Sequence, residues 1–311
     1  MQAQDYKHHL NKISHAVRAS QAVLQYGVGA MVDFPDQTLM TAAPESWTSE
    51  NGFLQIEKIN DERLENLLNV DYFGIPASKD DKNITDGISY VRFPEWYFCP
   101  KCRKFQPISK WIKDYQNTAS CLRAAENDPY MVQHMKCPIC KQELVVARII
   151  TVCSKGHISD FPWIEWVHCQ SKPQKPVCAN PDLRISTTAT SSEGLEGIQL
   201  ECRGCGAKAT LAGAFTTNKF SELEKKNGNR YNFRCIGSHP WKHLKEGCLE
   251  FPKVMQRGSS SVYFPVTESS LVIPPYSSIL AEKIQKTANF EKFQEAKQNR
   301  IEAIKELINC L

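Results

Sequence analysis

The sequence has no long hydrophobic run. It contains no stretch of about 18 apolar residues, the length that a transmembrane helix needs, and its longest candidate, residues 144–152, is interrupted by Arg148. The residues from Met1 to Leu10 are polar and lack the apolar core of a signal peptide. These absences predict a cytoplasmic protein without a membrane partner.

The sequence also lacks the common catalytic motifs. It contains no Walker A sequence, no Gly-x-Ser-x-Gly elbow, no His-Glu-x-x-His pair and no His-x-Glu element of a zinc deaminase. Gly27 and Gly29 are not followed by the Lys-Ser/Thr of a phosphate-binding loop, so they indicate a tight turn. We therefore expect that the chain is not an enzyme.

Cysteine, by contrast, is abundant. The chain has 13 cysteines, and all but Cys310 lie between residues 99 and 248. Disulfides are rare in a reducing cytosol, and several of these cysteines form Cys-x-x-Cys pairs, an interval that metal sites use. The pattern predicts bound metal.

Two matched Cys-Pro-x-Cys turns, Cys99–Cys102 and Cys137–Cys140, predict a zinc ribbon. Each turn places two thiolates on one side of a tight loop, and two such turns together supply the four ligands of a tetrahedral zinc ion. Strand-like sequence adjoins each turn. Cys121 and His134 lie between the pairs at a spacing that does not fit a cross-braced second site, so we expect neither to bind metal.

A second set of four thiolates is expected further along the chain. Gly204 and Gly206 suit the turn that its first pair requires. The predicted ligands are Cys202, Cys205, Cys235 and Cys248. His239 and His243 compete for the last two positions, although a four-thiolate set is complete without them.

The middle set is less regular. Cys153 and His157 fit one loop, and Cys178 is the expected third ligand. Either His168 or Cys169 is the fourth, because adjacent side chains usually diverge. An iron–sulfur cluster would also accept four thiolates, but separate Cys-x-x-Cys turns fit zinc better, and we expect two or three zinc ions.

These features predict an α+β fold with small zinc-ribbon units on short strands, an N-terminal mixed unit and a long C-terminal helix. Metal ions replace the core that such short strands cannot supply. The expected divisions are a mixed α/β unit at 1–95, a zinc ribbon at 96–150, a zinc-binding region at 151–250, an extended segment at 251–277 and a helix at 278–311.

Three element predictions are specific enough to compare with a structure. Residues 30–43 predict a hairpin that turns at Pro35-Asp36, and residues 57–70 predict an amphipathic helix. The C-terminal helix carries an apolar stripe that includes Leu280, Phe293 and Ile308. This stripe is expected to pack against another chain or to fold back on its own core.

Taken in order, the motifs resemble the DrmB family, the zinc-containing subunit of the DISARM anti-phage system. A collinear series of this kind is far more specific than one cysteine pair, and it favours His168 over Cys169. The matching segments are Arg18–Gln21, Gly27–Ala30, Trp47, Arg92–Pro94, Cys99, Cys102, Cys153–His157, Asp160–Trp163, Trp166–His168, Cys235, Pro240–Trp241, Gln256–Ser259, Val262–Pro265 and Ile273–Pro274.

The resemblance implies a role in prokaryotic defence beside a large helicase-type ATPase, with DNA bound by the complex. Members of that family are usually much longer, which implies a shortened variant or a separately encoded C-terminal half. We expect a non-catalytic scaffold that helps bind or gate DNA, with Arg257 as a candidate DNA or partner contact. The alternative is a free-standing zinc-ribbon regulator that binds nucleic acid. The net charge of +4 argues against it, since dedicated DNA-binding domains carry a stronger basic footprint.

Overall fold

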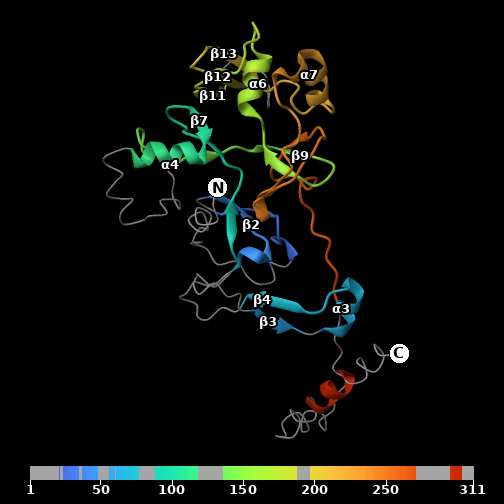
Figure 1. Cartoon of the computed structure of the whole chain (residues 1–311). Helices are drawn as coiled ribbons and strands as arrows, with labels where there is room; N and C mark the ends of the chain where they lie inside the picture. Colours follow the sequence, from blue (N-terminus) through green and yellow to red (C-terminus); the bar gives the residue numbers. More distant parts are fainter. Residues whose placement is uncertain are drawn as a thin grey trace. The chain divides into compact units, whose positions relative to one another are not determined.

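The chain divides into two compact units, which are described separately (Figure 1). Unit 1 comprises residues 1–58 and 74–267, and unit 2 comprises residues 59–73 and 268–311. The computed structural model describes residues 21, 24–34, 37–47, 56–59, 61–76, 88–117, 136–187, 197–270 and 295–302.

The largest sheet lies in unit 1 and is antiparallel, with strand order β13-β12-β11-β7-β6-β8. Its strands are β6 (Trp96–Phe98), β7 (Lys104–Pro107), β8 (Val145–Val146), β11 (Leu183–Thr187), β12 (Ile198–Cys202) and β13 (Ala207–Thr210). Phe105 of β7 lies opposite both Phe98 of β6 and Leu183 of β11. The β7–β11 pairing thus joins the β6–β7 hairpin, which carries one cysteine turn, to the β11–β12–β13 meander, which carries another between β12 and β13.

A second sheet of unit 1 has the order β10-β9-β16. Its strands are β9 (Ile149–Val152), β10 (Ile158–Asp160) and β16 (Lys253–Gln256). Lys253 lies opposite Val152 in the antiparallel register. This pairing brings residues 253–256 beside residues 149–152, immediately before Cys153.

The predicted N-terminal hairpin is confirmed. β1 (Met31–Asp33) pairs with β2 (Thr38–Thr41), Met31 lies opposite Met40, and β5 (Tyr90–Arg92) adds to β2. The 3₁₀ helix η1 (Pro44–Ser46) follows β2. The expected turn residues Pro35 and Asp36 lie outside the described residues.

The glycine run before this hairpin forms the expected tight turn. Gly29 has a φ of +83°, a conformation that suits glycine. A Cβ at Gly29 would lie 3.5 Å from the ring of Trp241. The turn at Gly29 therefore packs against the ring of Trp241, which is distant in the sequence.

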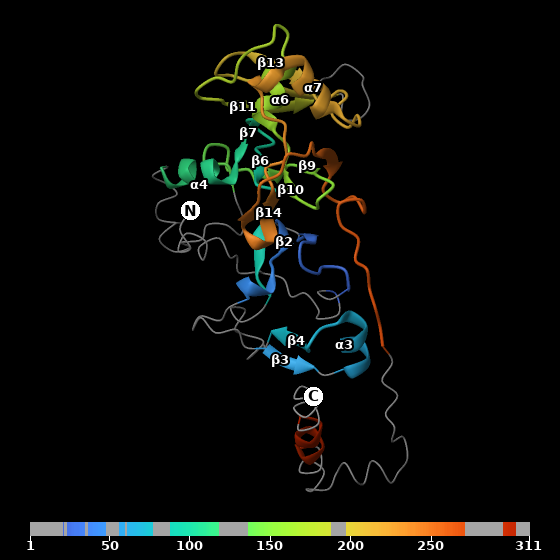
Figure 2. The same ribbon diagram turned by 45° about the vertical axis from the view of Figure 1, so that its right-hand side comes forward.

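The described part of unit 1 contains the helices α4 (Ile108–Gln116), α6 (Trp163–Gln170) and α7 (Lys219–Asn227), of which α4 contacts β7 of the largest sheet. α6 contacts β12 and β13. Figure 2 shows α6 close to β13 and α7. Fully buried side chains fill the space between them, namely Phe161, Trp166, Leu200, Leu211, Phe220 and Phe233. This aromatic cluster is the main hydrophobic core.

Short elements complete the region after α7. They are η4 (Gly228–Arg230), β14 (Ser238–His239), η5 (Pro240–Lys242) and β15 (Leu244–Lys245). β14 and β15 pair as a small hairpin. The Trp241 carbonyl accepts a 2.8 Å hydrogen bond from the N–H of Ala43, which ties this hairpin to the N-terminal sheet.

The helix predicted over 57–70 is shorter than expected. β3 (Ile56–Ile59) occupies its first residues, α3 spans Glu62–Leu68, and β4 (Phe73–Pro76) pairs with β3. Asp61 caps the helix because its Oδ1 accepts a 3.0 Å hydrogen bond from the N–H of Leu64. Asn69, with φ 53°, ends it in the left-handed conformation.

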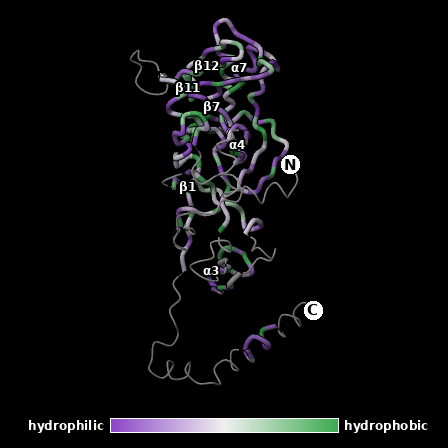
Figure 3. Tube along the Cα trace, turned by 90° about the vertical axis from the view of Figure 1, so that its left-hand side faces the viewer, coloured by the Kyte–Doolittle hydropathy of each residue, from purple (hydrophilic) through white to green (hydrophobic). Residues whose placement is uncertain are grey.

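The mixed α+β prediction with short antiparallel sheets is confirmed, but the described residues do not include a long C-terminal helix. Residues 295–302 are helical and exposed, and Figure 3 shows them as mostly hydrophilic. The remainder of the predicted helix over 278–311 and its apolar stripe lie largely outside the described residues. Within the described part of the chain, no helix has both the length and the apolarity that crossing a membrane requires.

Candidate metal centres

Among the described residues, three groups of four side chains each bring their potential ligand atoms within 4.8 Å of one another. Site 1 consists of Cys99, Cys102, Cys137 and Cys140. Site 2 consists of Cys153, His157, Cys235 and Cys248. Site 3 consists of His168, Cys178, Cys202 and Cys205.

Site 1 contains the predicted residues, but sites 2 and 3 differ from the predicted grouping. Cys153 and His157 were expected with His168 and Cys178, and the Cys202–Cys205 pair was expected with Cys235 and Cys248. In the structure, Cys235 and Cys248 instead join Cys153 and His157, and His168 and Cys178 join the Cys202–Cys205 pair. The residues are the predicted ones, but the pairs that meet are different.

Strand pairing explains the exchange. β16 begins shortly after Cys248 and lies antiparallel to β9, which ends at Val152, so Cys248 is drawn to Cys153. α6 follows β10 and packs across β12 and β13, so its residue His168 is carried to the turn that holds Cys202. Neither pairing can be inferred from the cysteine spacing alone.

A hairpin turn supplies two ligands to every site. Cys99 and Cys102 lie between β6 and β7, Cys153 and His157 between β9 and β10, and Cys202 and Cys205 at the turn from β12 to β13. Backbone amides face the sulfur atoms: the N–H groups of Cys102 and Cys140 point to the Sγ atoms of Cys99 and Cys137 at 3.5 and 3.4 Å. Such contacts favour thiolates.

Three of the cysteine turns end in the same left-handed conformation. Arg103, Lys141 and Gly206 have φ values of 63°, 58° and 70°. Their N–H groups donate back to the carbonyls of the first cysteine in each turn, at 2.9, 2.9 and 2.7 Å. Only one of the three is glycine, so the other two turns carry a strain of about 1–2 kcal/mol.

The spacing of the ligand atoms fits tetrahedral coordination. The Sγ atoms of Cys102 and Cys137 lie 3.9 Å apart, and those of Cys178 and Cys202 lie 3.6 Å apart. Around zinc, with bonds of about 2.3 Å to sulfur, two thiolates are separated by about 3.8 Å. The donor sets, four thiolates or three thiolates and an imidazole, are those of structural zinc sites.

The raised pKa values of several clustered thiols also indicate that each site needs a bound cation. Burial and the neighbouring thiols raise the pKa of Cys140 to about 12, that of Cys178 to about 11 and that of Cys235 to about 12. Three or four thiols so close together cannot all ionise on their own. A metal ion removes this repulsion and displaces the protons.

His168, not Cys169, faces site 3. The N–H at Nδ1 of His168 donates a 2.7 Å hydrogen bond to the Ile164 carbonyl, which leaves Nε2 3.3 Å from Cys205 Sγ. The Sγ of Cys169 instead accepts from Asn227 Nδ2 at 3.3 Å. The alternative left open by the cysteine pattern is thus resolved in favour of the histidine.

A further group of potential ligands adjoins site 2. It comprises His157, His239 and Glu246. His239 was considered for a different site or for a solvated loop, yet its side chain is only 17% exposed. His243 belongs to none of these groups, and Cys121 and His134 lie outside the described residues.

Substituting Gly237 is expected to destroy site 2 alone. Gly237 follows the ligand Cys235 with a φ of +63°, and a Cβ there would lie 1.7 Å from the backbone oxygen of Glu246. Gly237→Ala should therefore push the β14–β15 hairpin away and lower the bound metal by one ion per chain, as measured by elemental analysis.

Gly156→Ala is the matched control for Gly237. Gly156 lies in the other loop of site 2 with a φ of +81° but with nothing within 4 Å of an added Cβ. It should cost only about 1–2 kcal/mol of backbone strain and keep all the metal. Equal metal loss in both variants would contradict the steric explanation.

Arg257, the candidate DNA or partner contact, is engaged within the chain. Its guanidinium forms an ion pair with Asp33, and its side chain is 15% exposed. Burial raises the pKa of Asp33, but the hydrogen bond and charge of Arg257 outweigh this effect and leave the pKa lowered. Arg257 thus joins the turn after β16 to β1, and its contact with DNA or a partner stays a prediction.

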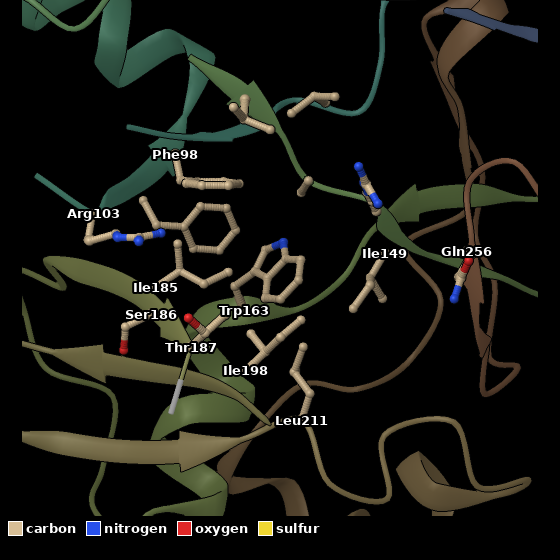
Figure 4. Close-up of a pocket in the computed structure, with 15 residues that line it drawn as sticks. Phe98, Arg103, Ile149, Trp163, Ile185, Ser186, Thr187, Ile198, Leu211 and Gln256 are labelled. Carbon is tan, nitrogen blue, oxygen red and sulfur yellow. The ribbon is translucent and has the colours of Figure 1, made fainter. Parts of the chain in front are cut away.

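An apolar pocket of about 340 Å³ lies against the six-stranded sheet. Figure 4 shows Trp163 near its centre, with Phe98 and Ile185 on one side and Ile149 and Gln256 on the other. Arg103 and Arg148 are its basic residues, and no His, Cys, Asp or Glu is among its lining side chains. Ser186 and Thr187 contribute hydroxyl groups to the lining, but no histidine or carboxylate lines the pocket to activate them as nucleophiles.

The fold and the sites together define a protein built from cysteine-turn hairpins around three potential metal centres. The sequence model of the family described as Domain of unknown function (DUF8724) matches residues 18–264, and the chain belongs to that family. The matched range contains all three sites. The family description itself gives no activity.

The chain is also a homologue of the DISARM protein DrmB from Bacillus paralicheniformis. The two are 30% identical over 252 residues, which is 79% of this chain and 38% of that relative. The chain therefore spans well under half of the longer protein. The resemblance to the DrmB family that the ordered motifs indicate is confirmed.

Proposed function

We propose that the chain is a zinc-loaded, non-catalytic scaffold subunit of a DISARM-type anti-phage complex. In this proposal it partners a helicase-type ATPase and helps to bind or gate DNA. The observation that carries the proposal is the presence of three four-ligand centres, all within residues 18–264 that the family model matches, in a chain homologous to DrmB.

The donor sets support a structural role for the zinc. Each of the three sites has four protein ligands, whereas a catalytic zinc keeps an open position for water or substrate. The absence of acid–base groups from the lining of the described pocket points the same way. The strands are short, so the ions supply cohesion that a larger core would otherwise provide.

Partnership with an ATPase should appear on purification from the native operon. The tagged chain is expected to bring a helicase-type ATPase with it, and the pair should bind DNA more tightly than the chain alone. Cys178→Ser, which breaks site 3, should lose both the partner and protection against phage in a plating assay. Cys169→Ser removes a thiol outside the sites and should retain both.

A different result would favour the alternative function. If the purified chain alone shifts DNA on a gel as strongly as the co-purified material, and no ATPase accompanies it, the protein is a free-standing nucleic-acid-binding regulator. Full phage protection by Cys178→Ser in the absence of bound zinc would contradict the scaffold role itself.

A further inference from the structure

The His157 ring nitrogen that points away from site 2, Nε2, needs a hydrogen-bond acceptor, and the other ligands of site 2 do not supply one. His157 presents Nδ1 to the site, 3.2 Å from Cys153 Sγ, and its side chain is only 4% exposed. A neutral imidazole that gives its Nδ1 lone pair to a metal carries its proton on Nε2. That N–H lies in a buried ring and requires an acceptor.

Glu246 faces this nitrogen. Its Oε2 lies 3.8 Å from His157 Nε2, and its Oε1 lies 3.5 Å from His239 Nε2. The two imidazole rings meet edge to face with centroids 4.6 Å apart. Two histidines thus converge on the two oxygens of one carboxylate, at distances somewhat longer than those of direct hydrogen bonds.

The β14–β15 hairpin holds the backbone of Glu246 beside site 2, and its half-exposed side chain reaches the two histidines. The hairpin lies between Cys235 and Cys248, two ligands of site 2, and the Glu246 N–H donates a 2.8 Å hydrogen bond to the Gly237 carbonyl. The His239 ring packs on Trp241 with centroids 5.1 Å apart. The segment 235–248, which provides two of the four ligands of site 2, therefore also places the Glu246 carboxylate beside a third ligand, His157.

Site 3 meets the same need in a different way. His168 uses Nε2 for the site, so its Nδ1–H reaches the carbonyl of Ile164 one turn back in its own helix. His157 uses the opposite nitrogen, and its Nε2 faces Glu246 instead. Metal-binding histidines almost always donate their second N–H to a carbonyl, carboxylate or water.

We propose that Glu246, supported by His239, positions His157 for metal binding and is not part of a fourth metal site. The inference rests on the proposed function, because it requires zinc in site 2. The carboxylate fixes the tautomer that exposes the Nδ1 lone pair and makes that nitrogen a stronger ligand. A fourth ion would require His157 to bind metals through both nitrogens, which demands loss of its remaining ring proton.

Competition with a chromophoric zinc chelator tests this role in the full chain. Glu246→Gln should bind one of three zinc ions about 10- to 100-fold more weakly and leave the other two unchanged. The weakened ion should be the one that Cys235→Ser lacks. Glu222→Gln, at an exposed glutamate of α7, is the matched control and should match the wild type.

His239→Phe provides a second, independent variant. It keeps an aromatic ring against Trp241 but removes the nitrogen that faces Glu246, so it should weaken the same ion by a smaller factor. Unchanged zinc affinities in Glu246→Gln would overturn the proposal. So would a wild-type chain with four ions, one of them lost in Glu246→Gln. A wild-type chain without zinc would instead contradict the proposed function, so the two failures are distinguishable.

Discussion

Replacing Cys153 and Cys235 together will remove one zinc ion per chain, whereas replacing Cys202 and Cys235 together will remove two. The structure places Cys153 and Cys235 in one site and Cys202 in another. In the grouping predicted from the sequence, Cys202 and Cys235 share one site. Replacing them would then remove one ion, and replacing Cys153 and Cys235 would remove two. Elemental analysis of the purified double-serine variants measures the difference directly, and Cys169→Ser should keep every ion.

The effect on the fold should be large. A structural zinc ion contributes about 10–16 kcal/mol in small zinc domains, which equals or exceeds the whole stability of a typical domain. Partial chelation of the wild-type chain gives a second measurement if a double variant proves insoluble. Cys235 and Cys248 should then react with an alkylating reagent together with Cys153, and not together with Cys202 and Cys205.

Trp166→Ala will cost about 3–5 kcal/mol of unfolding free energy even when zinc is saturating. Trp166 is completely buried, and its ring contacts Phe161 and Phe220 with centroids 5.3 and 6.4 Å away. Its Nε1–H donates a 2.9 Å hydrogen bond to the Thr210 carbonyl. The substitution leaves a cavity between α6 and the sheet, and urea denaturation followed by circular dichroism measures the loss.

Two variants separate the contributions of Trp166. Trp166→Phe keeps much of the ring volume but leaves the Thr210 carbonyl unpaired, which should cost about 1–3 kcal/mol. Phe264→Ala changes a side chain that is 75% exposed and should have little effect. A loss for Trp166→Ala no larger than that for Phe264→Ala would show that the aromatic cluster is not the core.

The site residues could be predicted because the information that identifies them is local. A Cys-Pro-x-Cys turn such as Cys99–Cys102 encodes both its ligands and its geometry within four positions. Flanking strands are equally local, and β5, β6 and β9 follow from runs of apolar and aromatic residues. The resemblance to the DrmB family could be recognised for the same reason, since it rests on short ordered motifs.

The grouping into sites could not be predicted because it depends on which strands pair. The register that sets Lys253 opposite Val152 decides the partner of Cys153, and nothing in the spacing of the cysteines specifies that register. The N-cap at Asp61 was a local signal that could have shortened the predicted helix. Glu246 carried no such signal, because a glutamate in a mixed-charge loop is usually a solvated one.

Sites 2 and 3 are nested in the chain, and this order has a consequence for synthesis on the ribosome. All ligands of site 3 lie between His157 and Cys235 of site 2, so the inner centre can close while the outer one still lacks its last two thiolates. A folded inner segment shortens the effective loop that remains to be closed. A nascent chain that stalls before Cys235 would therefore leave site 2 with only Cys153 and His157, at the stage when this cysteine is most open to oxidation and the pair to capture of another metal.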